Sequence, residues 1–152
     1  MPIIRRADVP VSSGTIYPPP MNEGMGKHHW WSLSDAAGLT QFGAALEELP
    51  PGAQSSHRHW HENEDEFLYV LAGEVTLVED DGEHLLGPGD AVGWKAGDQN
   101  GHTLRNHSDQ PARYIIVGTR AERDVCHYSD VDMLYTRDED GTRFTRRDGS
   151  PI

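Results

Sequence analysis

The stretch that decides the fold is residues 56–73, which read SHRHWHENEDEFLYVLAG. Successive side chains of a β-strand point to opposite faces. In a strand, His57, His59 and His61 would therefore share one face, where a strand that only packs a core would carry Val, Ile or Leu. Glu66 begins the next apolar run, and a buried carboxylate needs a partner or a cation. A hairpin between the two runs would bring Glu66 beside the histidines.

Imidazole nitrogens and a carboxylate together form a mixed site that suits Fe, Mn, Ni, Cu or Zn. A further histidine, His102, follows the polar loop at residues 97–100 and could supply a fourth ligand from a strand distant in sequence. The sequence thus predicts one divalent transition metal at a mononuclear site. The predicted ligands are His59, His61, Glu66 and His102.

Two registers fit the first part of this site, because His57 and His59 followed by Glu64 have the same spacing as His59 and His61 followed by Glu66. We prefer the later set, since Glu66 leads directly into the apolar strand. In that register His57 lies further along the same face. It is then a group that supports a ligand, a base that faces the substrate, or a solvated side chain.

Three other side chains near these segments are candidates for substrate chemistry. Glu64, like His57, could act as the base that moves a proton. Lys95 could meet an anionic substrate, and its neighbour Trp94 could contact the substrate as well. The alternative is that Lys95 is an ordinary surface lysine.

The rest of the chain favours an all-β fold with many short strands. The chain has 152 residues with 16 Gly and 10 Pro, a composition typical of strands joined by turns. Asp81-Gly82 between two apolar runs is a strong hairpin signal. Residues 39–49 favour a strand over a helix, and residues 142–145 could add an edge strand. Further strands are expected at residues 55–61, 66–71, 74–79, 83–86, 90–95, 101–106 and 112–119.

These residues resemble the two motifs of the cupin superfamily. The first is Gly-x-x-x-x-x-His-x-His-x-x-x-x-Glu-x-x-x-x-x-x-Gly, and residues 59–73 match it from the first histidine onward. Gly52 stands one residue further out than usual. The second motif is matched by Gly89, Gly97, His102 and Asn106. It departs from the family pattern in having Lys95 where Pro is usual and two extra residues between Gly97 and His102.

The resemblance is to small single-domain cupins of the sugar-phosphate-isomerase-like type. It implies a double-stranded β-helix, or jelly-roll barrel, at residues 37–130. Residues 1–36 would be an arm that packs its tryptophans on the barrel or on a partner subunit, and residues 131–152 a C-terminal extension. Cupins of this size usually form homodimers. The expected function is that of an enzyme for a small oxygenated metabolite, either an isomerase or epimerase or a dioxygenase; the alternative is a non-catalytic cupin that binds a sugar or effector.

The composition argues against other classes of partner. The net charge is −12, which disfavours binding to nucleic acid and to anionic membranes. The first residues lack the basic and apolar regions of a secretory signal, so a cytoplasmic location is expected. The single cysteine, Cys126, excludes a disulfide within the chain, and it is expected to be a small buried residue rather than a nucleophile.

Overall fold

The computed structural model describes residues 3–152, and the architecture is all-β, as the sequence predicts. The helices in this part of the chain are two single turns, η1 (Arg6–Asp8) and α1 (Leu33–Ala36), and neither is long enough to cross a membrane. The strands are β1 (Ser12–Ser13), β2 (His29–Ser32), β3 (Phe42–Leu49), β4 (His59–His61), β5 (Glu66–Ala72), β6 (Val75–Glu79), β7 (Gly82–Leu86), β8 (Ala91–Trp94), β9 (Thr103–Arg105), β10 (Ala112–Thr119), β11 (Asp124–Tyr128), β12 (Leu134–Asp138) and β13 (Gly141–Thr145).

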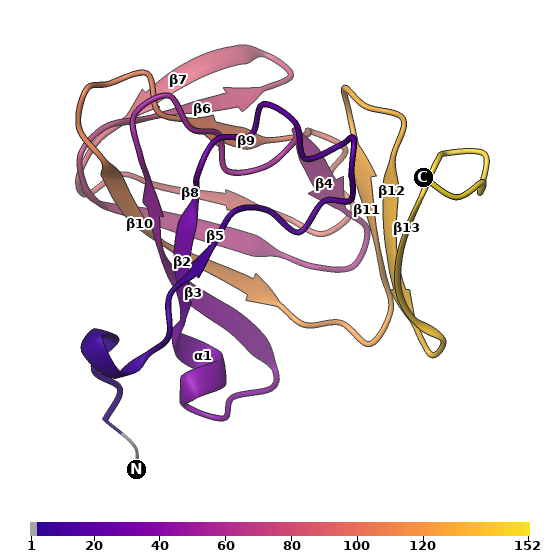
Figure 1. The fold of residues 1–152 in the computed structure, drawn as a ribbon, viewed down its shortest axis with the longest axis horizontal. Coiled ribbons are helices and arrows are strands. Elements are labelled where there is room, and N and C mark those ends of the chain that lie inside the picture. The colour runs from indigo at the N-terminus through magenta and orange to yellow at the C-terminus, as the bar shows by residue number, and fades with distance from the viewer. Residues whose placement is uncertain (1–2) are drawn as a thin grey trace.

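The strands form three sheets that surround a common interior in a jelly roll without closing edge to edge (Figure 1). The largest sheet has the order β1-β2-β3-β10-β5-β8. The second has the order β13-β12-β11-β4, and the third the order β7-β6-β9. Neighbouring strands in all three sheets are antiparallel.

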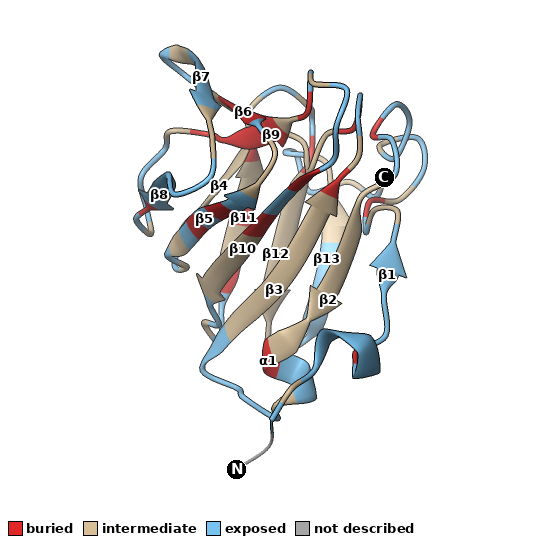
Figure 2. Ribbon diagram, turned by 90° about the vertical axis from the view of Figure 1, so that its left-hand side faces the viewer, coloured by how far each residue is buried: buried red, intermediate tan, exposed pale blue. Residues whose placement is uncertain are grey.

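Alternation of apolar side chains along β5 positions the main core. Leu68 and Val70 are fully buried, whereas Phe67 and Tyr69 between them are exposed. Their buried neighbours come from β3, β6, β8, β9 and β10. Figure 2 shows that buried residues gather around β5, β6 and β9. The inner face of β5 therefore contributes Leu68 and Val70 to the core, and Glu66 lies on the same face at the start of the strand.

The N-terminal arm is more ordered than its composition suggests. Residues 29–32 form β2 and pair with β3, although no strand was predicted in the arm. Earlier in the arm, Tyr17 and Met25 are buried against Cys126 and Tyr128 of β11. The arm therefore packs on the body of its own chain.

The C-terminal extension also contains more sheet than expected. The predicted edge strand at residues 142–145 is present as β13, and it pairs with β12 across the turn at residues 138–141. Neither β11 nor β12 was predicted. They stand at one side of the molecule, in orange and yellow in Figure 1. β11 matters most for function, because it is the neighbour of β4.

Candidate metal centre

The four predicted ligands converge inside the barrel. Atom Oε2 of Glu66 lies 2.8 Å from Nε2 of His102 and 3.8 Å from Nε2 of both His59 and His61. The ligand atoms of His59, Glu66 and His102 all lie within 4.8 Å of one another. All four side chains are largely buried. The arrangement therefore gives three imidazole nitrogens and one carboxylate oxygen in a single cluster.

The route by which Glu66 reaches the histidines differs from the predicted hairpin. β4 pairs with β11, whereas β5 pairs with β10 and β8, so the two strands belong to different sheets. The carbonyl of His61 accepts from the amide of Gly97, and the amide of Glu62 donates to Val125. These bonds occupy the backbone that a β4–β5 hairpin would need. The connection crosses between sheets instead, and both inner faces meet in the middle.

His102 is brought to β4 by the backbone. The amide of His59 donates to the carbonyl of His102 and the amide of His102 donates to the carbonyl of His59, at 3.0 and 2.9 Å. The two extra residues before His102 fit into the loop ahead of it. There the side chain of Asn100 donates to Glu79 and accepts from the amide of Asp80.

Hydrogen bonds on the outer side fix two of the imidazoles. Nδ1–H of His59 donates to the carbonyl of His57 at 2.9 Å, and Nδ1–H of His61 donates to Oδ2 of Asp124 at 2.6 Å. With the proton on Nδ1, the lone pair of Nε2 is directed toward Glu66. This is the tautomer that binds a metal through Nε2. Among residues 3–152, Nδ1 of His102 has no hydrogen-bond partner.

The electrostatics favour the neutral form of His59 and the ionised form of Glu66, which are the forms that bind a metal. Burial, and then the charge of His102, lower the pKa of His59 to about 3, so its imidazole is neutral. Burial alone would raise the pKa of Glu66, but the hydrogen bond from His102 and the other imidazoles outweigh it and lower the pKa to about 2. A neutral imidazole beside an ionised carboxylate is the donor set that the sequence predicts for a divalent transition metal. The residues present therefore fit such a cation.

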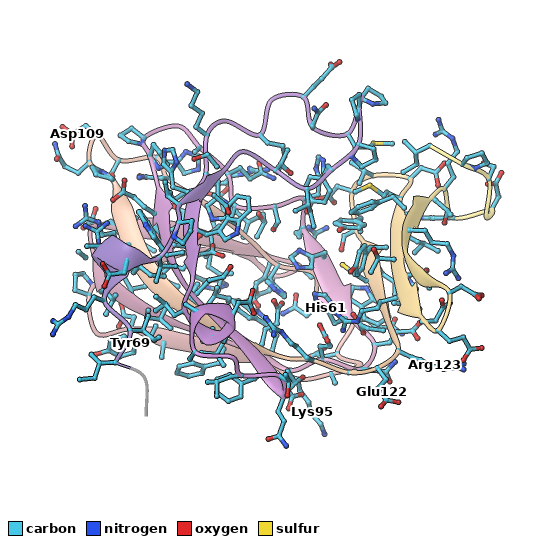
Figure 3. The ribbon with its side chains drawn as sticks, turned by 60° about the horizontal axis from the view of Figure 1, so that its bottom comes forward. His61, Tyr69, Lys95, Asp109, Glu122 and Arg123 are labelled. Carbon is cyan, nitrogen blue, oxygen red and sulfur yellow. The ribbon has the colours of Figure 1, made fainter. Side chains whose placement is uncertain are left out.

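The two substrate-binding candidates from the second motif lie in different places. The indole of Trp94 stacks on the imidazole of His102, with ring centroids 3.8 Å apart and planes 9° apart, and it lines the inner cavity. Its Nε1–H donates to Glu79 at 2.7 Å. Lys95 is exposed and lines none of the hollows found within residues 3–152, and Figure 3 shows it at the edge of the molecule while His61 lies inside. Lys95 therefore matches the alternative of a surface lysine.

The two candidate bases are both held by other groups. Nε2–H of His57 donates to the carbonyl of Met21 at 2.7 Å, and this side chain lines no hollow in the described part of the chain. The strand expected from residue 55 begins only at His59, so His57 does not continue the face of His59 and His61. Glu64 lines the outer hollow, but one of its oxygens is bound by Arg137 and by an amide. The shifted ligand set therefore does not assemble.

Two connected hollows lie beside the cluster. The inner one, of about 120 Å³, is bounded by His59, Glu66 and His102. The outer one, of about 350 Å³, lies between the N-terminal arm and β4, β11 and β12. They share the lining residues His28, Glu47, Ser55, Ser56 and His59. A small molecule that enters from the arm side therefore reaches the imidazoles.

Sequence reasoning missed several residues of this site. Asp124 and Cys126 come from β11, and the thiol of Cys126 lies within 4.8 Å of ligand atoms of His59 and His61. Pairing of β11 with β4 could have been inferred only from long-range contacts. Glu47, which was not among the predicted site residues, lines both hollows. The available signal was its position two residues before Leu49, on the same face of β3 as that buried leucine.

The fold and this cluster define the class: a jelly roll with an inward-facing site of histidines and a carboxylate. Residues 45–118 match the family described as the Cupin domain. A sugar phosphate isomerase of the cupin superfamily from Silicibacter pomeroyi is 44% identical, with 99% of this chain and 96% of that chain covered and a TM-score of 0.95. The chain belongs to the cupin superfamily.

Two further solved structures are similar to this chain. A candidate sugar phosphate isomerase from Acidithiobacillus ferrooxidans is 27% identical, with 88% of this chain and 84% of that chain covered and a TM-score of 0.78. The polyketide cyclase RemF from Streptomyces resistomycificus is 24% identical, with 78% and 79% covered and a TM-score of 0.63, which is a likeness of fold alone. No curated protein matches.

Proposed function

We propose that this chain is a metal-dependent enzyme for a small oxygenated metabolite, and that its reaction is the isomerisation of a sugar phosphate. The observation that carries the proposal is the convergence of His59, His61, Glu66 and His102 on one cavity. The relative from Silicibacter pomeroyi, described as a sugar phosphate isomerase and similar over nearly the whole chain, supports isomerisation over the dioxygenase alternative.

The four ligand residues would hold the cation. When bound, a divalent transition metal supplies Lewis-acid polarisation of a carbonyl or hydroxyl oxygen. The chain itself supplies the surroundings. Leu68, Leu104 and Ile116 contribute apolar side chains to the lining of the inner hollow.

The opposite wall suits a molecule with many hydroxyl groups. Ser55, Ser56 and Thr103 line the inner hollow, and their hydroxyls lie 3.3 to 3.5 Å apart in a connected group. Hydroxyls both donate and accept hydrogen bonds, so they can match the alternating groups of a polyol chain. The outer hollow, of about 350 Å³, falls within the ~300–1,000 Å³ typical of small-molecule sites.

The anionic end of such a substrate would meet Arg137 rather than Lys95. In the described part of the chain, Arg137 is the one Arg or Lys side chain that lines the outer hollow. It is partly exposed there and pairs with Glu64. A guanidinium presents several donors to a phosphate and can bind it while keeping a carboxylate partner.

Elemental analysis tests the metal site directly. The wild type should carry close to one transition-metal ion per chain, and His61→Ala should lose it. His107→Ala, which changes an exposed histidine, is the matched control and should keep it. The loaded protein is then assayed against small aldose and ketose phosphates. A wild type that stays metal-free after reloading sinks the proposal and favours the non-catalytic alternative.

A further inference from the structure

A second group of polar side chains lines the hollows away from the metal ligands. Nε2–H of His28 donates to Oε2 of Glu47 at 2.8 Å, and these side chains are 12% and 16% exposed. Tyr114, which is 1% exposed, lines the inner hollow beside them. None of the three belongs to the metal cluster, and Glu47 lines both the inner and the outer hollow.

Strand register places this group at a defined distance from the ligands. Glu47 of β3 pairs with Tyr114 of β10, which pairs with Val70 of β5. Glu66 lies four residues back along β5 on the same inner face. At ~3.3 Å per residue, the backbone of Glu66 is therefore separated along the strand by roughly 13 Å from the row of paired residues that contains Glu47 and Tyr114. The side chains extend inward from both rows, so a substrate of a few carbons can touch both groups.

The hydroxyl of Tyr114 is placed to contact a ligand in the inner hollow. Among residues 3–152 this buried oxygen has no hydrogen-bond partner. Leaving such a group unpaired costs about 1–3 kcal/mol, which a ligand oxygen would recover. Burial, and then the charge of Glu47, raise the pKa of Tyr114 well above its usual value. Its hydroxyl therefore stays protonated and is available as a donor.

We propose that Glu47, positioned by His28, is the base that moves a proton between neighbouring carbons of a hydroxy-carbonyl substrate, and that Tyr114 donates a hydrogen bond to a substrate oxygen. This inference rests on the proposed function and assigns the residues that perform its proton transfer. It differs from the two bases expected from the sequence. Glu64 forms an ion pair with Arg137, whose positive charge stabilises the carboxylate and weakens it as a base, and His57 faces the arm.

The step is balanced without an oxidant or reductant. Glu47 takes the proton from the carbon beside the carbonyl, and the C–H electron pair becomes the C=C bond of an enediolate, whose negative charge lies on oxygen. The carbonyl oxygen receives the proton that the neighbouring hydroxyl releases. Glu47 then returns its proton to the former carbonyl carbon, and the neighbouring carbon becomes the new carbonyl. The carbonyl has moved by one carbon, and the base is regenerated.

Three substitutions separate this role from structural effects. Glu47→Gln and Tyr114→Phe each preserve shape while removing a base or a donor. Glu48→Gln is the matched control, because Glu48 is the next residue in β3 and pairs with Arg113 on the outer face. All three proteins are loaded with zinc, and their metal content and melting temperature are compared with those of the wild type.

The first readout is binding of glycolohydroxamate, a stable mimic of an enediolate, measured by titration calorimetry. Tyr114→Phe should bind it about tenfold more weakly than Glu48→Gln does, as expected for one lost hydrogen bond in a buried site. The second readout is exchange of the carbon-bound proton of small aldose and ketose phosphates in deuterium oxide, followed by NMR. Glu47→Gln should exchange at least ~100-fold more slowly than Glu48→Gln.

Each outcome decides between the two proposals. Equal binding and equal exchange in all three variants overturn the assignment of Glu47 and Tyr114. The assignment is also overturned if zinc-loaded wild type catalyses proton exchange in none of these substrates and if Tyr114→Phe binds glycolohydroxamate as tightly as the wild type does. That outcome would leave the metal site intact. Wild type that holds no zinc overturns the proposed function itself, and this inference with it.

Discussion

Nδ1 of His61 lies 2.6 Å from Oδ2 of Asp124, a carboxylate whose side chain has no exposed surface. The other oxygen of Asp124 accepts from the amide of Asn63 at 2.9 Å. Burial alone would raise the pKa of Asp124, but the hydrogen bond from His61 and the other donors outweigh it and lower the pKa. The carboxylate is therefore ionised, and it holds the imidazole in the tautomer that exposes Nε2.

Asp124→Asn should weaken metal binding about 10–100-fold, the usual effect of losing a group that orients a ligand. An amide offers only one acceptor, so either His61 or Asn63 loses its partner. The measurement is competition for zinc with a chromophoric chelator. Asp130→Asn, which removes an exposed partner of Arg58, should leave the affinity unchanged. Equal affinities in both variants would show that Asp124 does not orient a ligand.

The contact between Trp94 and His102 predicts an optical signal for the metal. Because the rings are stacked at 3.8 Å, Cu²⁺ bound at Nε2 of His102 would lie close enough to quench the indole. Adding Cu²⁺ should lower the tryptophan fluorescence of the wild type, and Trp94→Phe should abolish most of that change. Trp60 provides the control, because it stacks on His127 on the far side of β4. Trp60→Phe should therefore show the same quenching by Cu²⁺ as the wild type. Unaltered quenching in Trp94→Phe would argue against His102 as a ligand.

Local sequence patterns predicted most of the strands because recognisable turn residues separate short apolar runs. β5, β6, β7 and β10 lie within a residue or two of their expected positions, and the Asp81-Gly82 hairpin is present. These segments make their backbone hydrogen bonds with adjacent strands, and local Gly, Asp and Pro residues mark the turns between them. Their local patterns therefore carry the same information as the fold.

The remaining features depend on contacts that local patterns cannot show. The amide of His57 donates to the hydroxyl of Tyr17, 40 residues away, which diverts this segment from the sheet and shortens the strand predicted from residue 55. β11 reads DVCHY, a short mixed segment whose strand character comes from its pairing with β4 and β12. Asp124 thus reaches His61 only through tertiary structure, and the same holds for His28 and Glu47.

Acid should destabilise the metal-free protein in the range below about pH 6.5. The pKa of His59 is lowered from 6.5 to about 3, and that of Glu66 from 4.5 to about 2. Between each pair of values the unfolded chain binds a proton that the folded protein refuses, so stability falls as the pH falls. The pKa of His61 is raised above its usual 6.5. The stability that its protonated form contributes is therefore lost only as the pH rises above 6.5, which lies outside this range. Each unit of lowered pKa corresponds to at most about 1.4 kcal/mol.

Thermal unfolding in the presence of a chelator, at a series of pH values, measures this effect. The melting temperature of the wild type should fall steadily from pH 6.5 downward. His59→Gln, which lacks the titrating imidazole, should show a flatter curve between pH 6.5 and 4.5, where Glu66 does not yet contribute. Parallel curves for the two proteins would mean that the cost of protonating His59 is small.

Gly73, the last residue of the first motif, is fixed by the backbone opposite it. Its φ is +72°, in the left-handed region, and a Cβ there would lie 2.6 Å from the carbonyl oxygen of Pro111 and 2.9 Å from Cα of Ala112. Backbone atoms cannot move aside as a flexible side chain can. Gly73→Ala should therefore lower the free energy of unfolding by at least about 2 kcal/mol, from strain and displacement of β10 together.

Gly87→Ala is the control, because φ there is not left-handed and the nearest atom, Oδ2 of Asp90, is 3.9 Å away. Urea unfolding of both variants measures the difference, and a Gly73→Ala protein as stable as Gly87→Ala would mean that the β5–β6 turn tolerates a side chain and that the motif glycine is not required by packing.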